Sequence, residues 1–328
     1  MEYRKLGRTG FKVSEISLGT WQTGGKWGSS FNAENADQII NVAIDNGVNF
    51  IDTADVYSGG MSEAAVGKVI RSRNERVYIA TKCGRQIYPH SSEGYQPKVL
   101  RKFVEDSLKR TGLETLDLIQ LHCPPSEVYY RPEIFETFGH LKQEGKILNM
   151  GVSVERVEEA LKAIEYPDVT TVQIIFNLFR QKPAEQFFEA ARRHDIGIIV
   201  RVPLASGLLT GLYNSATVFA AGDHRNFNRN GEAFDKGETF SGINYEQGLK
   251  AVEALKSLFP GEKNLAPYAL QWILSFEEVS CIIPGASSPD QVLSNLSLYG
   301  LPSLTKEQIG AMNNIYYEYI KNEVHHLW

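Results

Sequence analysis

Short apolar runs alternate with amphipathic stretches through most of the 328-residue chain. Several runs are rich in Val and Ile, and most lack strict alternation of apolar and polar residues, as strands buried on both faces of a sheet require. The eight runs are EISLGT (15–20), NFIDTA (49–54), VYIATK (77–82), LDLIQLH (116–122), ILNMGVS (147–153), TTVQIIFN (170–177), IGIIVRV (196–202) and VSCIIPG (279–285). The pattern predicts eight buried strands.

The stretches between these runs have the periodicity of amphipathic helices. The apolar residues of segment 36–44 fall on one helical face, and Gly47 then offers a C-cap. The same pattern recurs over 100–108, 154–164 and 184–191. Strand–helix alternation repeated eight times predicts an α/β fold, the (β/α)8 TIM barrel, whose usual length is about 250 residues or more. A doubly wound sheet is the rival, but no Gly-x-Gly-x-x-Gly follows the first strand.

Two segments fall outside the repeat. Residues 1–14 predict a small N-terminal β-hairpin that turns at Arg8-Thr9-Gly10 and caps the floor of the barrel. Residues 205–244, after the seventh strand, predict a long, glycine-rich and polar loop, which is typical of an active-site cover. No low-complexity linker divides the chain, so we expect one domain over residues 1–328.

Composition narrows the class of protein. An apolar content of 42% with 22% charged residues is typical of a soluble globular protein. The net charge of −5 and the scattered basic residues argue against a nucleic-acid or membrane surface, and no apolar run reaches membrane-spanning length. Cys83, Cys123 and Cys281 have no metal-like or redox spacing, so they indicate reduced thiols in a cytoplasmic protein. The oligomeric state is not encoded in a readable form.

The ends of the predicted strands bring reactive side chains to one place, because barrel enzymes form their sites at the C-terminal ends of the strands. Asp52, Lys82 and His122 lie at the ends of three successive strands, and Tyr57 follows the first of these. Taken singly, each has an ordinary interpretation as a capping carboxylate, a solvated lysine, a buried histidine or a packed aromatic, and that interpretation is favoured. Taken together at one opening, they favour a catalytic site.

Together these four residues make a proton donor. Tyrosine has a pKa of about 10, so Tyr57 is protonated at neutral pH but is a weak acid. We expect Lys82 to lower that pKa and Asp52 to keep Lys82 charged in a partly dry site. His122 can hydrogen-bond a carbonyl oxygen and orient it toward Tyr57. No activated nucleophile and no metal cluster is indicated, so the carbonyl needs a hydride, which implies a nicotinamide cofactor.

The sequence resembles the aldo-keto reductase family over nearly its whole length. GVNFIDTADVYSGGMSEAAVG resembles the family's first signature, and ATKCG, LIQLHCP, GVSV, VQIIFNLF, PLASGLLTG and IPGASSPDQVLSN match its later blocks in order. The family's catalytic tetrad carries over to Asp52, Tyr57, Lys82 and His122. The resemblance implies reversible NAD(P)(H)-dependent reduction of aldehydes or ketones.

The resemblance also implies cofactor contacts. Ser153 and Gln173 match the positions that hold the nicotinamide carboxamide, and Arg201 stands where many relatives stack an aromatic ring on the nicotinamide. The other implied contacts are Thr20, Trp21 and Asp52 at the strand ends, Leu204, Ser206, Gly207 and Leu208 in the loop that follows the pyrophosphate, and Gly285, Ser287, Gln291 and Asn295 around the adenosine end.

Three departures from the family pattern bear on the cofactor. Val154 replaces a common amide after the fifth strand, and Leu212 replaces a common lysine after the seventh. The segment GASSPDQ lacks the basic residues that many relatives use for the 2′-phosphate, and Ser287 and Gln291 are weaker anion ligands. Our hypothesis is that Arg225 or Arg229 in the long loop compensates by folding over the cofactor. We therefore expect NADPH, with NADH as the alternative.

Substrate identity is barely encoded. Aromatic residues on loops after the strand ends are the candidates for the pocket wall, beside Tyr57 and His122, because apolar pockets tend to be lined by such residues. These candidates are Trp21, Trp27, Tyr88, Tyr129 and Phe227. Packing between loops is an equally good interpretation for each of them except Trp21, whose family position supports a pocket role.

Two other functions remain open at this level, beside the leading hypothesis of a reductase for a small carbonyl compound. A cofactor-binding, redox-sensing module of the potassium-channel β-subunit type shares this fold and a similar adenosine-end pattern. Those relatives lack a histidine at the position of His122, which argues against it. An NAD-dependent sugar dehydrogenase that runs in the oxidative direction is the third possibility.

Overall fold

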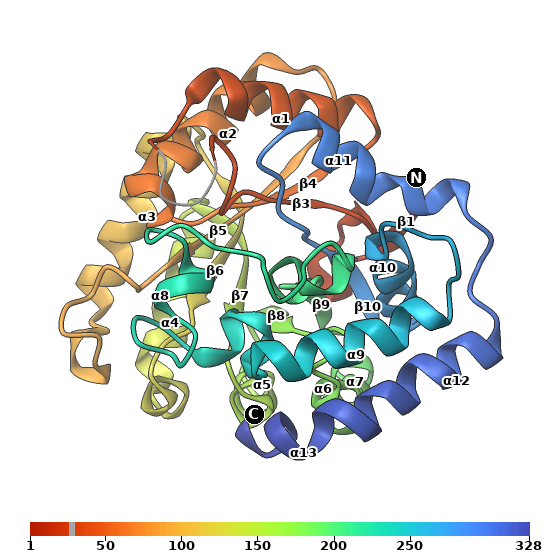
Figure 1. Ribbon diagram of the computed structural model, residues 1–328. Coiled ribbons are helices and arrows are strands. Elements are labelled where there is room, and N and C mark those ends of the chain that lie inside the picture. The colour runs from red at the N-terminus through yellow and green to blue at the C-terminus, as the bar shows by residue number, and fades with distance from the viewer. Residues whose placement is uncertain (26–29) are drawn as a thin grey trace.

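The computed structural model describes residues 1–25 and 30–328, and it confirms the predicted (β/α)8 barrel (Figure 1). Within these ranges, eight parallel strands pair in chain order. They are β3 (Leu18–Gly19), β4 (Phe50–Asp52), β5 (Tyr78–Cys83), β6 (Leu116–His122), β7 (Ile147–Ser153), β8 (Val169–Ile175), β9 (Gly197–Arg201) and β10 (Val279–Ile282). The ring closes beside β3 and β10, where the Ser17 N–H donates to the Ile282 carbonyl (2.8 Å) and the Gly19 N–H to the Pro284 carbonyl (3.1 Å).

Helices surround this ring of strands (Figure 1). They are α1 (Ala33–Asp45), α2 (Met61–Ser72), α3 (Pro97–Thr111), α4 (Pro132–Gln143), α5 (Val157–Ala163), α6 (Lys182–Gln186), α7 (Phe188–Arg193), α8 (His224–Phe227), α9 (Tyr245–Ser257), α10 (Ala266–Leu274), α11 (Pro289–Leu296), α12 (Lys306–Ile315) and α13 (Lys321–Val324). The apolar face predicted for segment 36–44 is the buried face of α1, and it packs in one cluster with Ile51 of β4. Among the described residues, no helix has the length and apolar character needed to cross a membrane.

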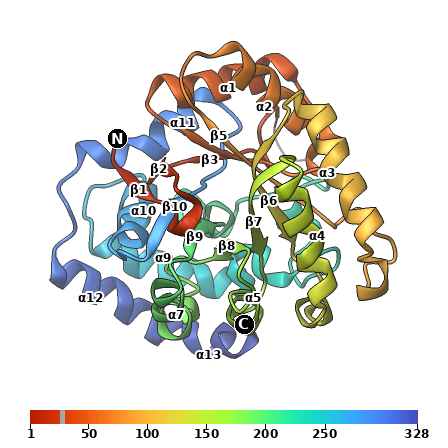
Figure 2. The ribbon, with the colours of Figure 1, turned by 180° about the vertical axis from the view of Figure 1, so that it is seen from behind.

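The predicted N-terminal hairpin is present. β1 (Tyr3–Lys5) pairs antiparallel with β2 (Lys12–Ser14), and Gly10 makes the turn with a φ of 80° that suits glycine. The turn docks on the barrel through the Arg8 N–H, which donates to the Asp195 carbonyl just before β9 (2.8 Å). Seen from behind, the hairpin lies in front of the strands, on the side away from the loops that form the candidate site (Figure 2).

Leu6 forms part of the floor of the barrel. This side chain follows β1, is fully buried, and shares a cluster with Phe50, Leu118 and Ile199, which come from three barrel strands. The hairpin therefore fills the N-terminal end of the barrel with apolar side chains, and the opposite end is left for polar residues.

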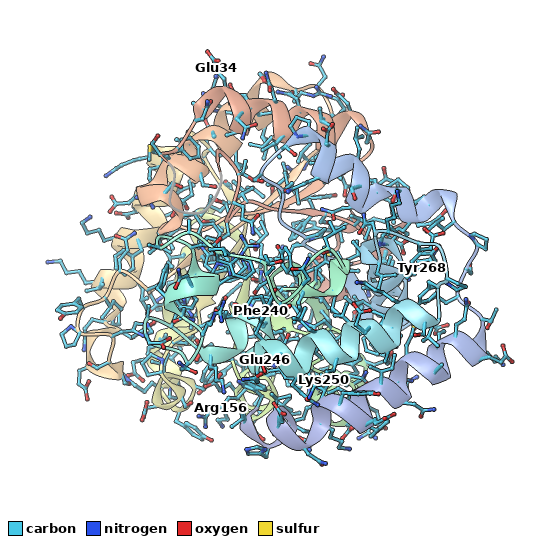
Figure 3. The ribbon with its side chains drawn as sticks, viewed as in Figure 1. Glu34, Arg156, Phe240, Glu246, Lys250 and Tyr268 are labelled. Carbon is cyan, nitrogen blue, oxygen red and sulfur yellow. The ribbon has the colours of Figure 1, made fainter. Side chains whose placement is uncertain are left out.

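The segment after β9 crosses the C-terminal ends of the strands before the chain enters α9 (Figure 1). It contains α8 and several short 3-10 turns rather than one unbroken loop. Phe240 anchors its end, because the ring packs on Phe219 and Tyr245 with centroid distances of 5.7 and 5.1 Å. Glu246 and Lys250 on the following α9 are exposed, whereas Phe240, which precedes that helix, is buried; all three are labelled in Figure 3.

A buried carboxylate lies in the connection after β4. Asp55 is 2% exposed, and its backbone N–H donates to the Lys82 carbonyl (3.2 Å). Its Oδ2 accepts from Gln86 Nε2 (2.8 Å), whereas Oδ1 has no hydrogen-bond partner among the described residues. Burial, followed by the nearby Glu63 carboxylate, raises the pKa of Asp55 from 3.8 to about 7. Asp55 therefore fixes the position of the loop but carries an unfavourable charge at high pH.

Leu6→Ala tests the floor of the barrel. Because Leu6 is fully buried, the variant loses apolar contacts and leaves a cavity, so we expect the free energy of unfolding to fall by about 2–5 kcal/mol in urea titrations. The control is Leu148→Ala at a side chain that is 42% exposed, where a change within about 0.5 kcal/mol is expected. Equal effects of the two substitutions would contradict the role of Leu6.

Asp55→Asn tests the buried charge. The folded-state pKa of about 7 lies above the ordinary value of 3.8, so the stabilising contribution of the protonated carboxyl is complete below pH 3.8 and is lost as the pH rises through 7. We expect the Tm of Asp55→Asn relative to wild type to increase between pH 5 and pH 8 by more than about 2 °C. Glu277→Gln, at an exposed carboxylate, is the control and should show no such trend. If the Tm of Asp55→Asn relative to wild type decreases as the pH rises, Asp55 does not have a raised pKa in the folded protein.

Candidate active site

Four side chains from three neighbouring strands converge at one point. Asp52 ends β4, and Tyr57 lies on the turn that follows it. Lys82 lies in β5, and His122 ends β6. Lys82 Nζ donates to Asp52 Oδ1, to the Thr53 carbonyl (2.9 Å) and to the Tyr57 hydroxyl (3.1 Å). All three donors of the ammonium group are used, and one of them is committed to the phenol.

Asp52 is held in turn by two glutamine amides. Its Oδ2 accepts from Gln120 Nε2 (3.1 Å) and Gln173 Nε2 (2.8 Å), and Gln173 also donates to Gln120 Oε1 (3.2 Å). Asp52 and Lys82 are each 1% exposed, and a buried ion pair persists only when its remaining polar atoms are hydrogen-bonded. Gln173, which the resemblance assigns to the carboxamide, lines the cavity while it also holds Asp52.

Burial changes the expected acidity of Tyr57. Desolvation of the phenolate raises the pKa of Tyr57 above 10.0 and outweighs the lowering effect of Lys82. Lys82 therefore acts in the direction expected from the sequence, but burial has the larger effect. For Lys82, burial disfavours the charge, but Asp52 and Tyr57 more than offset it and raise its pKa above 10.5. Both groups are protonated at neutral pH.

His122 is a neutral imidazole beside the phenol. Its ring lies edge-on to Tyr57 with a centroid distance of 5.9 Å, and both residues line the same cavity. Burial, and then the charges of Arg85 and Lys82, lower the pKa of His122 well below 6.5. A neutral imidazole can donate one hydrogen bond and accept another, which suits a group that orients a carbonyl oxygen.

A cavity of about 820 Å³ opens over these side chains. The residues expected from the sequence that line it are Thr20, Trp21, Asp52, Tyr57, His122, Gln173, Arg201, Leu204, Ser206, Gly207, Arg225, Gly285, Ser287, Gln291 and Asn295. Ser153 and Leu208 are fully buried and do not line it; Ser153 Oγ lies 3.6 Å from Cys123 Sγ, and Leu208 packs in the core. The fold thus gathers one continuous surface from strand ends that are distant in the sequence.

Backbone strain marks the start of the segment after β9. Val202, Ala205 and Ser206 have positive φ values of 52°, 46° and 56°, and Gly207 follows at 90°. Such conformations cost energy for residues other than glycine, and they concentrate at functional sites. Ser206 Oγ donates to the Glu238 carbonyl (2.9 Å), so this turn is tied to the far end of the segment. The turn lines the cavity in the loop where the resemblance implies pyrophosphate contacts.

The end of the cavity near α11 carries neutral polar groups. The Ser287 N–H and Oγ–H both donate to Gln291 Oε1, at 2.7 and 3.1 Å. Asn295 Nδ2 donates to the Gly285 carbonyl (3.4 Å). Among the described lining residues, no lysine or arginine comes from this part of the chain.

The two arginines expected to face the cofactor have different surroundings. Arg225 lines the cavity, where Asp223 pairs with its Nη2 (2.6 Å), and Nη1 donates to the Ser206 carbonyl (3.5 Å). Arg229 does not line the cavity: its Nε donates to the Arg225 carbonyl (2.8 Å), and its guanidinium stacks on Tyr245. Arg225 therefore lies beside the strained turn rather than at the α11 end, and Arg229 packs away from both.

Aromatic side chains cover the catalytic end of the cavity. Trp21 stacks on Tyr57 with a centroid distance of 6.2 Å, and Phe234 meets Trp21 edge-on at 5.8 Å. The ring centroids of His224 and Trp21 lie 5.2 Å apart. Phe234 and His224 belong to the segment after β9, so this segment forms part of the cover, as the sequence suggests.

The other aromatic candidates for the pocket wall lie elsewhere. Tyr88 is 96% exposed, Tyr129 is fully buried, and Phe227 is 41% exposed; none of the three lines the cavity. The expectation that these three residues line the pocket is therefore not met, because the sequence of a loop does not encode the direction of its side chains. Trp27 falls within residues 26–29, outside the described residues.

The sequence did not reveal a cluster of charges on the same wall. Glu238 Oε1 pairs with Arg201 Nη1 (2.9 Å) and accepts from Arg85 Nη2 (3.4 Å), which also donates to Glu155 Oε1 (3.0 Å). Arg85 lies on the loop after β5, directly beyond Lys82, and that position is a signal that sequence reasoning can use. Glu238 lies deep in the long loop with no motif around it, so only the fold reveals it.

This cluster does not resemble a metal site. Ligand atoms of Cys123, Glu155 and Glu238 lie within 4.8 Å of one another. However, both carboxylates are engaged by guanidinium groups, and burial raises the pKa of the Cys123 thiol above 9.0. Protonated thiol and arginine cations disfavour a bound cation.

Known proteins match the chain along nearly all of its length. The model of the "Aldo/keto reductase family" matches residues 15–317. The chain is 29% identical over 318 residues to the uncharacterized oxidoreductase YqkF of Bacillus subtilis (strain 168), covering 96% of each, and 29% identical over 321 residues to a probable voltage-gated potassium channel subunit beta of Arabidopsis thaliana, covering 93% of each. The structure of the glycerol dehydrogenase AKR11B4 from Gluconobacter oxydans matches with a TM-score of 0.77 and 30% identity, covering 97% of this chain and 96% of that one. The resemblance seen in the sequence is therefore confirmed, and the chain belongs to the aldo/keto reductase family.

Proposed function

We propose that this protein reduces aldehydes or ketones to alcohols with NADPH, with Tyr57 as the proton donor. The observation that carries the proposal is the hydrogen bond from Lys82 Nζ to the Tyr57 hydroxyl (3.1 Å), at a cavity that His122 also lines. Membership in the aldo/keto reductase family supports an oxidoreductase, and proteins of this family bind nicotinamide cofactors.

The four residues divide the work of proton transfer. When bound, the reduced cofactor supplies the hydride. The neutral His122 donates a hydrogen bond to the carbonyl oxygen and holds it near the Tyr57 hydroxyl. As negative charge develops on that oxygen, Tyr57 gives up its proton, because an alkoxide is a much stronger base than a phenolate. Lys82, kept charged by Asp52, stabilises the phenolate that remains.

The cavity suits a nicotinamide dinucleotide. Its lining extends from His122 to Gln291, past the strained turn at Ser206. We assign the turn and Arg225 to the pyrophosphate, because a guanidinium beside a strained backbone turn is an anion-binding arrangement. The neutral groups of Ser287 and Gln291 give the 2′-phosphate only weak ligands, so the preference for NADPH over NADH is expected to be small.

Two alternatives share this site. Similarity to a glycerol dehydrogenase favours oxidation of a polyol with NAD(P)⁺, which uses the same residues in reverse. Similarity to a potassium-channel β-subunit favours a cofactor-binding sensor. His122 at the cavity, beside Tyr57, supports turnover over sensing, because a sensor needs no group that orients a carbonyl.

Tyr57→Phe tests the proton donor. The substitution removes the hydroxyl and keeps the ring on Trp21, so we expect kcat for aldehyde reduction to fall by about 10²–10⁴-fold while the Kd for NADPH stays within about threefold. Tyr88→Phe, at an exposed tyrosine outside the cavity, is the matched control and should match wild type. Unimpaired turnover in Tyr57→Phe would exclude Tyr57 as the acid.

Arg225→Ala and Arg229→Ala test the cofactor contacts. Loss of a charge-assisted hydrogen bond is worth about 1.5–3 kcal/mol, so Arg225→Ala should raise the Kd values of both NADPH and NADH by about tenfold or more. Arg229→Ala should leave both unchanged, because Arg229 does not line the cavity. Fluorescence titration of each cofactor gives the Kd values, and the wild-type values should differ by less than about tenfold. An unchanged Kd in Arg225→Ala would refute the assignment of Arg225.

A further inference from the structure

Arg85 lies on the cavity wall with part of its guanidinium group uncommitted. Its side chain is 21% exposed and lines the cavity together with Tyr57 and His122. Within the described residues, only Nη2 donates hydrogen bonds to the protein, to Glu155 (3.0 Å) and Glu238 (3.4 Å). Nε and Nη1 therefore keep N–H groups that a ligand in the cavity can accept from.

Arg201, the second guanidinium of the cluster, is bound to the protein through both of its terminal nitrogens, while its buried Nε has no hydrogen-bond partner among the described residues. Its Nη1 pairs with Glu238 (2.9 Å), and its Nη2 donates to the Val154 carbonyl (3.0 Å) and lies 3.5 Å from Cys123 Sγ. Burial disfavours the charge of Glu238, but Arg201 and then Arg85 more than offset this and lower its pKa below 4.5. Glu238 is therefore ionised, and the shorter distance makes it mainly the counter-ion of Arg201.

Glu155, the remaining counter-ion of Arg85, is not fully ionised near neutral pH. Glu155 is the closer carboxylate, but burial, followed by Asp235, raises its pKa to about 7. Arg85 and Arg201 thus share two carboxylates, Glu238 and Glu155, and the raised pKa of Glu155 makes it the weaker counter-ion near neutral pH. Arg85 therefore keeps surplus positive charge, and its planar guanidinium suits a single carboxylate.

The surplus charge lies next to the reacting end of the cavity. Arg85 and His122 line the same cavity, and among nearby charges Arg85 has the largest effect in lowering the pKa of His122. Trp21 and Phe234 supply apolar surface over the same region. A carbonyl held by His122 would place a substituent a few atoms away against Arg85.

We propose that the carbonyl substrate of this protein is a short oxo acid, whose carboxylate binds Arg85 while its carbonyl oxygen meets Tyr57 and His122. This inference rests on the proposed function and names the substrate class of the same site. Arg85 presents a planar fork of N–H donors, which fits the two oxygens of a carboxylate.

The reaction balances without any change at the carboxylate. The hydride supplied by the reduced cofactor bonds to the carbonyl carbon, the C=O π bond breaks, and the Tyr57 proton goes to the oxygen. The product is a hydroxy acid, the cofactor is left oxidised, and Tyr57 regains a proton from solvent. Because the carboxylate charge is the same in substrate and transition state, Arg85 acts on KM rather than on kcat.

The test compares 4-oxobutanoate with its methyl ester, which has the same reacting aldehyde and no charge. We expect wild type to favour the acid in kcat/KM by about tenfold or more. Arg85→Gln should raise KM for the acid by about tenfold or more and change the ester by less than about threefold. Arg85→Lys should retain part of the preference, because the charge remains without the fork.

Arg101→Gln is the matched control. Arg101 lies on α3 and is paired with Glu144 at the surface, outside the cavity. Its loss should therefore leave KM unchanged for both the acid and the ester. Two results would overturn the inference. One is that wild type has equal kcat/KM values for the acid and the ester, and the other is that Arg85→Gln raises KM equally for both.

Calorimetric binding of 4-hydroxybutanoate and 1,4-butanediol to the protein, with and without NADP⁺, separates this inference from the proposed function. We expect the hydroxy acid to bind about tenfold tighter or more, with the difference lost in Arg85→Gln. If no aldehyde is reduced but this difference is present, the proposed function fails and the carboxylate site stands. If aldehydes are reduced but hydroxy acid and diol bind alike, the carboxylate site fails and the reductase stands.

Discussion

The buried ion pair between Lys82 and Asp52 is the interaction on which the candidate site depends. Both side chains are 1% exposed, and such a pair is tolerated only when every remaining donor and acceptor is used. Gln120, Gln173 and the Thr53 carbonyl meet this requirement, and the last donor of Lys82 reaches the phenol. Strands β4, β5, β6 and β8 are thereby joined through polar atoms at one end of a barrel whose other end is apolar.

This arrangement fixes the protonation states on which the proposed chemistry rests. Burial disfavours the charge of Lys82, and Asp52 and Tyr57 more than offset this effect. The same burial raises the pKa of Tyr57 and lowers that of His122, so the site combines a protonated phenol, an ammonium and a neutral imidazole. Each state follows from a balance between desolvation and a named partner, which is how one fold supports acid chemistry near neutral pH.

The segment after β9 completes the site from above. Phe234 and His224 lie on Trp21, the strained turn at Ser206 is tied to Glu238, and Glu238 pairs with Arg201. A buried acid from a loop thus joins cations from the strand ends and the β5 loop, including Arg85, which lines the cavity. The loop that covers the site also sets the charge of its wall.

The sequence by itself determined the barrel, the hairpin and the set of residues at the strand ends. Apolar runs without alternation specify strands buried on both faces, and the ends of parallel strands lie at the same side of the barrel, where the site forms. For that reason Asp52, Lys82 and His122 could be read as neighbours from the sequence, and the structure brings them together.

Tertiary structure decided everything that depends on side-chain direction or on contacts between distant loops. Tyr88 and Tyr129 come from similar loop positions, yet one points to solvent and the other into the core. The net pKa of Tyr57 depends on burial, which no local pattern encodes. The pairing of Glu238 with Arg201 and Arg85 joins three separate segments, and packing alone sets the distances between them. Sequence periodicity fixes which residues reach the site, whereas solvation and long-range pairing fix what those residues do there.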